Sequence, residues 1–489
     1  MNSSFNKLAK GSYFLILDNL VNLGIGAIFW LILAKMIEPA ALGQAMVVTG
    51  FATTIVGFSG YGIQVALSKY MSEYNAKNMP NAAKRMLKNS IRGSLILSGI
   101  MAVIISVLSG QISTLAYQDS SLALLLVFTI STFLPTQTVI AALLGAFQGM
   151  QIMKYVTMAD LIFQASRMAF AVFAVVYGLE VFGILLGFSL ASFLSLVVCY
   201  FYLLPRAIPA SSEKKEADEG TKHVVNFVSL SYFSVGIKTF SAQLGILILG
   251  TQSFEWAAFY GLALLISKIV GSFSHSVGGA LLPTASEERI RGNKGELRKM
   301  VNTSVRISIL ISGFGFMILM IDPMYLLSLI SDSYVEAAWA LRILAIAAVV
   351  AAIGSILISL LNASNRAADV AKIGLVSALS TILLTFILAP IDGLEGAAIA
   401  MLVGSSLSLI LSLIVLKQKE ELIISSRSII KPFVPILGGL VIGYIFVLLN
   451  QVLVGIILAI SCYVAFSIVY RVTTKVEIMR LIGIIVNRK

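Results

Sequence analysis

About fourteen apolar stretches run along this chain of 489 residues, and most of its 35 lysines and arginines lie at the termini and in alternate connections between them. An apolar stretch of about 20 residues is long enough to cross a bilayer as a helix. Lysine and arginine are enriched in the cytoplasmic loops of such proteins. We therefore expect an all-α, multi-pass protein of the cell membrane, with both termini and the basic loops in the cytoplasm.

The other connections are short and often acidic, as at Glu38, Asp119, Glu180 and Glu255, and we expect them to be external. The predicted spans are 11–34, 43–66, 90–110, 122–148, 157–178, 181–204, 227–250, 256–282, 304–322, 337–361, 371–390, 394–416, 432–450 and 452–470.

Composition excludes several other classes of protein. Hydrophobic residues make up 58% of the chain and charged residues only 12%, whereas about a quarter of a soluble domain is charged. The net charge of +12 is spread between apolar spans, where it sets topology and meets anionic headgroups, so we expect no nucleic-acid partner. Cys199 and Cys462 both lie in apolar stretches, and their number and spacing indicate neither a disulfide framework nor a metal site.

The chain contains an internal repeat. The segment 270–306 aligns without a gap on 56–92, and Ser231-Tyr232-Phe233 echoes Ser12-Tyr13-Phe14 upstream. Gly178-Leu179-Glu180 returns as Gly393-Leu394-Glu395 near the end of each copy. Since each copy holds six spans, both enter the membrane from the same side, and the copies are parallel.

This repeat predicts the domain organisation. We expect a first lobe at 1–204, a cytoplasmic linker at 205–226, a second lobe at 227–417, and an appended pair of spans with a tail at 418–489. Two similar bundles around a central site suit alternating access, in which the lobes rock about that site.

These features resemble a known family. The plan of six, six and two spans, the segment 145–151, the basic loops with Ser72-Glu73 and Ser286-Glu287, and the Gly-Leu-Glu turns are similar to the polysaccharide-transport flippases. That family belongs to the multidrug/oligosaccharidyl-lipid/polysaccharide exporter superfamily. The resemblance implies transport of a polyprenyl-pyrophosphate-linked oligosaccharide, with spans 1, 2, 7 and 8 lining the cavity. Its expected partners are this substrate, membrane lipids and a glycan polymerase or glycosyltransferases.

Two lysines lie near the middle of predicted spans, where a charge costs about 2.5–3.5 kcal/mol on insertion scales. They are Lys238 in span 7 and Lys268 in span 8. Their ammonium groups would bind phosphate oxygens without any covalent step. Pairing with a carboxylate or snorkelling to an interface remains an open alternative for each.

Span 1 carries Asp18, Asn19 and Asn22, of which Asp18 and Asn22 share a helix face. We count Asn19 and Asn22 as candidate substrate ligands. Asp18 is a candidate for ion coupling, or it neutralises Lys238, because the repeat places Lys238 opposite Asn19.

Span 5 holds Asp160, Gln164 and Arg167, whose spacing places them on one helical stripe as an internal polar ladder. Asp160 is a second candidate for ion coupling. Arg167 either contacts substrate or packs inside the lobe. His275 in span 8 shares a face with Lys268, and we weigh a proton-coupling role for it against that of a hydrogen-bonded polar residue.

The main alternative is an ion-coupled drug or metabolite antiporter of the same superfamily, which shares the twelve-span repeat. A membrane glycosyltransferase would need a large catalytic loop, and no predicted loop is long enough. A passive scaffold would not explain intramembrane charges in both repeats. Without such a loop we expect no enzyme activity and no cofactor. Because there is no nucleotide-binding motif, we expect an ion gradient or the membrane potential as the energy source.

Overall fold

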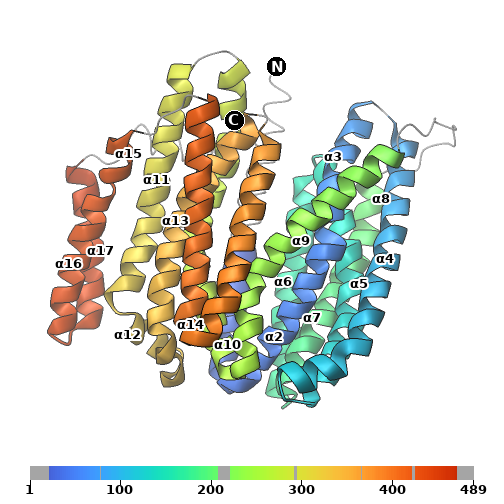
Figure 1. Cartoon of the computed structure of the whole chain (residues 1–489), viewed down its shortest axis with the longest axis horizontal. Helices are drawn as coiled ribbons and strands as arrows, with labels where there is room; N and C mark the ends of the chain where they lie inside the picture. Colours follow the sequence, from blue (N-terminus) through green and yellow to red (C-terminus); the bar gives the residue numbers. More distant parts are fainter. Residues whose placement is uncertain are drawn as a thin grey trace. The chain divides into compact units, whose positions relative to one another are not determined.

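A computed structural model describes residues 21–77, 79–207, 221–290, 294–364, 366–420 and 425–470. Every regular element in these ranges is helical, as predicted (Figure 1). Contacts divide the described chain into two compact units, which we call the N-terminal unit, 21–261, and the C-terminal unit, 262–470.

The N-terminal unit begins with a helix at Val21–Met36. The following elements are α2 (Pro39–Val56), η1 (Gly57–Tyr61), α3 (Gly62–Ala76), α4 (Pro80–Gln111), η2 (Ile112–Ala116), α5 (Ser121–Gly149), α6 (Met153–Val176), α7 (Glu180–Val197), η3 (Val198–Leu203), α8 (Leu204–Ala207), α9 (Thr221–Gln252) and the first turns of α10 (Phe254–Ile290). Proline opens α2 and α4, where its fixed φ suits the first helical position and its missing N–H is not needed.

The C-terminal unit holds the rest of α10. Its further elements are α11 (Lys294–Ile321), α12 (Pro323–Ser328), η4 (Asp332–Ala337), α13 (Ala338–Ala363), α14 (Ala367–Glu420), α15 (Ser426–Ile430), α16 (Phe433–Leu448) and α17 (Val452–Val469). The side chain of Asp322 caps α12 by accepting a hydrogen bond from the backbone N–H of Tyr325 at 3.0 Å.

The predicted spans map onto these helices. Eleven of the described helices are long and apolar enough to cross a membrane. The helix Val21–Met36, α9, and the second half of α14 account for the other three of the fourteen spans expected. Predicted spans 11 and 12 are the two halves of α14, which are separated by a turn at Gly393, where φ is 57° and ψ is −127°. Of the predicted linker, 208–220 lies outside the described residues, and 221–226 belongs to α9.

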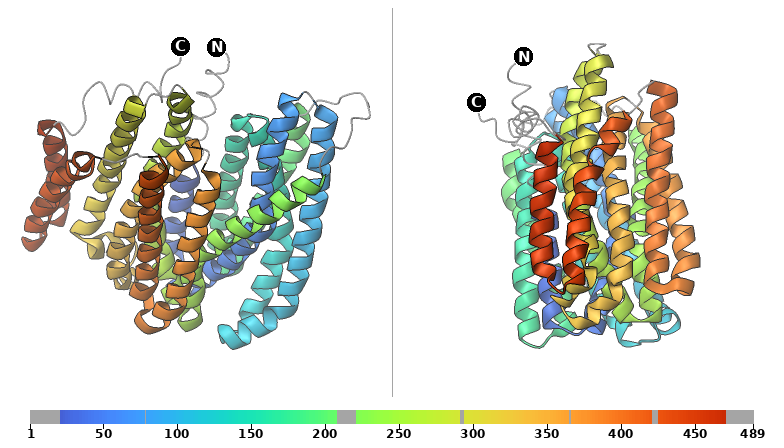
Figure 2. Two further views of the ribbon diagram at one scale, coloured as in Figure 1. Left: turned by 45° about the horizontal axis from the view of Figure 1, so that its top comes forward. Right: turned by 90° about the vertical axis from the view of Figure 1, so that its left-hand side faces the viewer.

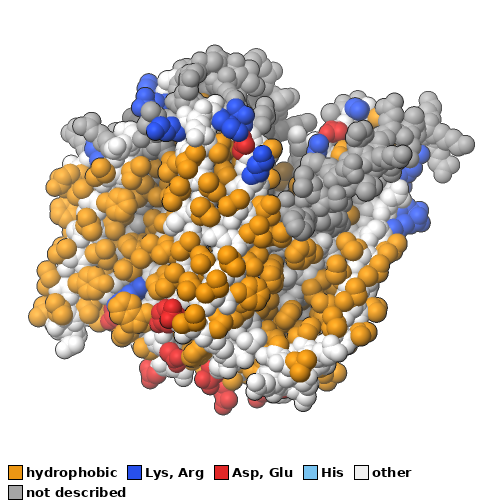
Figure 3. Space-filling model, viewed as in Figure 1, with side chains coloured by type: hydrophobic (Ala, Val, Ile, Leu, Met, Phe, Trp, Pro, Cys, Tyr) orange, Lys and Arg blue, Asp and Glu red, His pale blue; other side chains and the backbone are white. Residues whose placement is uncertain are grey.

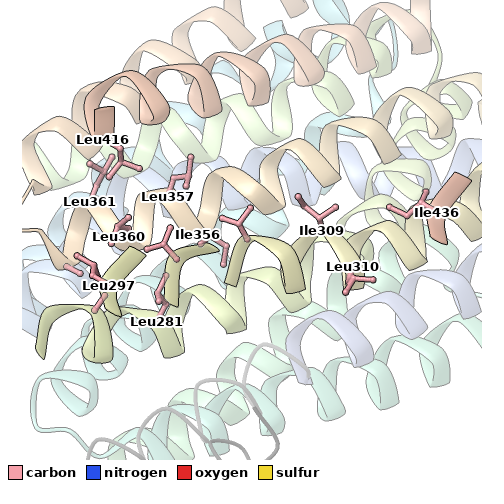
Figure 4. Packing of buried hydrophobic residues seen from close by; sticks show 14 of the residues in the cluster. Leu281, Leu297, Ile309, Leu310, Ile356, Leu357, Leu360, Leu361, Leu416 and Ile436 are labelled. Atoms are coloured by element: carbon pink, nitrogen blue, oxygen red, sulfur yellow. The ribbon is translucent and has the colours of Figure 1, made fainter. Parts of the chain in front are cut away.

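The core of the C-terminal unit joins α10, α11, α13 and α14 through buried leucines and isoleucines such as Leu281, Ile309, Ile356 and Leu416 (Figure 4). Ile436 and Tyr463 belong to the same cluster, so the appended helices α16 and α17 pack onto α11 (Figure 2).

The surface of this unit suits a membrane. Figure 3 shows hydrophobic side chains over the length of its helices on the visible face, with most lysine and arginine near one end and most aspartate and glutamate near the other. Leucine, isoleucine and valine side chains are exposed along α14, α16 and α17. Such side chains are stable without burial in the protein when they face lipid.

Helix α9 opens the second repeat in sequence but packs within the N-terminal unit, against α2, η1 and α3. Glycines allow this close approach. A Cβ atom at Gly57 would lie 2.7 Å from Cβ of Thr239, and one at Gly236 would overlap the ring of Phe58. The boundary between the contact units therefore falls inside α10, although the repeat boundary predicted from sequence lies before α9.

Candidate transport site

The polar stripe of α6 forms a ladder with the first described helix. Nδ2 of Asn22 donates to Oδ2 of Asp160 at 3.2 Å, and Nε2 of Gln164 donates to Oδ1 of Asn22 at 2.7 Å. Gln164 is buried, and Asp160 and Asn22 are half-buried. The one-turn spacing on α6 predicted a shared face, and the amide of Asn22 bridges the two α6 side chains across 138 and 142 residues of chain.

One turn beyond Gln164, the guanidinium of Arg167 lies in a cage of aromatic rings and is only 6% exposed. Its Cζ atom is 4.2 Å from the ring centroid of Phe29, 4.8 Å from that of Phe188 and 5.6 Å from that of Phe163. Gly26 leaves room for it, since a Cβ atom there would lie 3.7 Å from Nη2. Cation–π attraction therefore offsets part of the cost of burying this charge.

The edges of the same guanidinium remain available. Among the residues that the structure describes, Nε and Nη2 of Arg167 have no hydrogen-bond partner, and neither does Oε1 of Gln164. Donors and an acceptor of this kind, on one helix stripe and away from lipid, favour a bridging water or another small polar group between them.

The aromatic cage around Arg167 was not predicted from the sequence. Phe29 lies among several aromatic residues of span 1, and Phe163 and Phe188 carry no signal of their own in the sequence. The only available clue was a cation on an apolar helix with Phe163 one turn before it.

Lys238 lies in the middle of α9, and its side chain is exposed. Gly236 and Thr239 lie against the helix segments around Phe58 and Gly57, so helical spacing places Lys238 on the face of α9 turned away from them. Its own carbonyl accepts a hydrogen bond from Oγ of Ser241 at 2.8 Å. The ammonium group is therefore not enclosed by the N-terminal unit.

Lys268 belongs to the C-terminal unit, in α10, and its side chain is also exposed. The backbone of His275 continues the same helix two turns later, but its side chain lies outside the described residues, as do Asp18 and Asn19 entirely. The structure thus brings together Asn22, Asp160 and Gln164 with Arg167 beside them, and it leaves the two lysines on exposed faces of their own units.

Comparison with known proteins gives the family. The family model described as "Polysaccharide biosynthesis protein" matches residues 8–288, more than half of the chain. This chain belongs to that family. A second model, described as MatE, matches residues 231–391, in agreement with membership of the multidrug/oligosaccharidyl-lipid/polysaccharide exporter superfamily.

Several relatives and solved membrane-transporter structures are similar to this chain. The chain is 25% identical over 430 residues to an uncharacterized membrane protein of Methanocaldococcus jannaschii, covering 85% of this chain and all of that one. It is 24% identical over 340 residues to the lipid II flippase MurJ of Bacillus subtilis, covering 62% of each. The fold matches a structure of MurJ in an inward closed conformation, with a TM-score of 0.73, 14% identity and coverage of 93% and 99%. An inward-facing MATE transporter matches with a TM-score of 0.61, 13% identity and coverage of 82% and 92%.

Proposed function

We propose that this protein is a flippase that moves a polyprenyl-pyrophosphate-linked oligosaccharide across the cytoplasmic membrane by alternating access. Membership of the polysaccharide biosynthesis family and similarity to MurJ support transport of a lipid-linked substrate. The observation that carries the proposal is an exposed lysine in the middle of each of two membrane helices, Lys238 in α9 and Lys268 in α10. An anionic pyrophosphate offsets the cost of holding such charges in a membrane.

The polar ladder has a separate role in this proposal. Asp160, held by Asn22, is the described candidate for ion coupling, and Asp18 and His275 remain the other two. Direct contact of Asn19, Asn22 or Arg167 with substrate stays a prediction. For Arg167, burial among three aromatic rings favours a role inside the N-terminal unit.

The second candidate is an ion-coupled antiporter of small molecules. The MatE model match over 231–391 and the similarity to MATE structures favour it. Exposed lysines oppose it where the cargo is cationic, because like charges repel.

The test uses the full-length protein in proteoliposomes. One set of vesicles carries a fluorescent sugar on polyprenyl pyrophosphate, and flipping is measured as loss of fluorescence to a membrane-impermeant quencher. The other set carries an organic cation dye with an imposed proton or sodium gradient. We expect flipping of the lipid-linked sugar and no dye movement. Gradient-driven dye transport without sugar flipping would replace the flippase with the antiporter.

Charge removal at the two lysines gives the first residue-level prediction. Lys238→Ala and Lys268→Ala should each abolish sugar flipping, because a neutral side chain leaves the pyrophosphate without its counter-charge, while membrane insertion is unchanged. Lys88→Ala is the matched control, since Lys88 is an exposed lysine of α4 away from the proposed site. Normal flipping by the double variant Lys238→Ala/Lys268→Ala would show that neither lysine binds the pyrophosphate.

A further inference from the structure

The first observation concerns the acidic end of the N-terminal unit, which we define by Glu38, Asp119, Glu180 and Glu255. There α2, from the first repeat, meets the end of α9 and the start of α10, from the second. A Cβ atom at Gly43 would overlap the carbonyl of Phe254 and lie 3.2 Å from the backbone nitrogen of Ala258. The two repeats therefore touch backbone to backbone at this end.

The connection between α4 and α5 crosses this junction. Tyr117 is only 8% exposed, and its hydroxyl donates to the carbonyl of Leu247 in α9 at 2.9 Å. Its ring stacks on Phe254 of α10, with centroids 5.9 Å apart and planes 1° apart, and Phe51 of α2 packs edge-on at 6.0 Å. A Cβ atom at Gly250 would lie 3.1 Å from the Tyr117 ring, so the glycine at this position leaves room for the ring.

The same connection is fixed to the first repeat. The carboxylate of Asp119 accepts a hydrogen bond from Nε2 of Gln44 in α2 at 2.7 Å, and from the backbone N–H and hydroxyl of Ser121 at 2.9 and 2.7 Å. The hydroxyl of Ser113 donates to the carbonyl of Asp119. The backbone around Tyr117 is therefore fixed to the first repeat, while its side chain is bound to the second repeat.

We infer that Tyr117 is a latch that holds the acidic end of the N-terminal unit closed. The inference rests on the proposed alternating access, in which this end must open during part of the cycle. Separation of α2 from α9 and α10 breaks the Tyr117 hydrogen bond to Leu247 and withdraws its ring from Phe254. The latch therefore sets how often this end opens in the absence of substrate.

Opening is measured at a reporter cysteine placed in the junction. The background variant is Cys199→Ala/Cys462→Ala, and the reporter is Ala258→Cys, at a position with no exposed surface. The rate of labelling by a maleimide, without substrate, is proportional to the open population. Loss of one hydrogen bond in Tyr117→Phe should raise this rate about twofold to tenfold. Tyr117→Ala, which also loses the ring, should raise it more.

Two controls keep the result specific. Tyr177→Phe changes a tyrosine of the same unit that is 71% exposed, and it should leave labelling of Ala258→Cys unchanged. A second reporter, Ala146→Cys, lies fully buried in α5. An equal rise at both reporters in Tyr117→Ala would mean general loosening and would overturn the latch, as would an unchanged rate at Ala258→Cys.

A cross-link tests whether this end opens during transport. A Cβ atom at Gly250 would lie 2.5 Å from Cγ2 of Val47, so Val47→Cys/Gly250→Cys in the same background places two thiols side by side. Oxidation should stop sugar flipping, and a reductant should restore it. Continued flipping with a complete cross-link would show that this end does not open during transport, and it would overturn the latch. Absence of flipping by the protein without the two added cysteines would count against the proposed flippase, while the labelling rates would still decide the latch.

Discussion

At the scale of single residues, the Asn22 side chain connects Asp160 to Gln164 in the polar ladder, and its removal should lower the free energy of unfolding. Asn22→Ala removes the acceptor of the Nε2 donor of buried Gln164 and the Nδ2 donor to Asp160. Each buried polar group that loses its partner costs about 1–3 kcal/mol. We therefore expect a lower melting temperature for Asn22→Ala, measured in detergent by intrinsic fluorescence.

A double-mutant cycle separates this structural role from substrate binding. Gln164→Ala combined with Asn22→Ala should cost less than the two single changes added, because the donor that Asn22→Ala strands is gone. If Asn22 is instead a substrate ligand, Asn22→Ala will keep its melting temperature and lose only transport. That result would return Asn22 to the role first predicted from sequence.

At this scale the sequence predicts which residues of one helix share a face, but not which residues of other helices they contact. The positions of Asp160, Gln164 and Arg167 on α6 predicted a shared stripe, because helical spacing is a local property. The bridge from Asn22 and the cage of Phe29 and Phe188 depend on how distant helices pack, and no pattern within one span contains that information.

At the scale of elements, the Gly-Leu-Glu turns test the repeat. Gly178 and Gly393 both have positive φ, at 81° and 57°, a region that L side chains rarely adopt. Gly393→Ala should therefore destabilise the protein by about 1–3 kcal/mol. Gly374→Ala is the control in the same helix, since a Cβ atom there meets nothing within 4 Å and the change should stabilise by up to about 1 kcal/mol.

A thermal melt of both variants gives the measurement, with Gly178→Ala as the equivalent change in the first repeat. Equal melting temperatures for Gly393→Ala and Gly374→Ala would mean that the turn accepts a side chain, and that the glycine is not what makes the two repeat turns alike.

The elements were more predictable than their packing. Apolar length and charged ends predicted the helices, and the repeated tripeptides predicted the two turns. The position of α9 against α2, η1 and α3 was not predicted, because it depends on small-to-large pairs between helices, such as Gly57 with Thr239. Hydropathy reports that a helix lies in a membrane but not which neighbour it touches.

At the scale of the whole molecule, the charge distribution predicts orientation, and this is the last test. In the predicted linker, Ser212 follows Arg206 and precedes Lys214 and Lys215, whereas Leu179 lies in an acidic connection beside Glu180. Because lysine and arginine stay in the cytoplasm, Ser212→Cys should resist a membrane-impermeant maleimide in intact cells and react after lysis. Leu179→Cys, which is 43% exposed, should react in intact cells. The background is Cys199→Ala/Cys462→Ala. The reverse labelling pattern would contradict the predicted orientation and would place the Tyr117 latch on the cytoplasmic side.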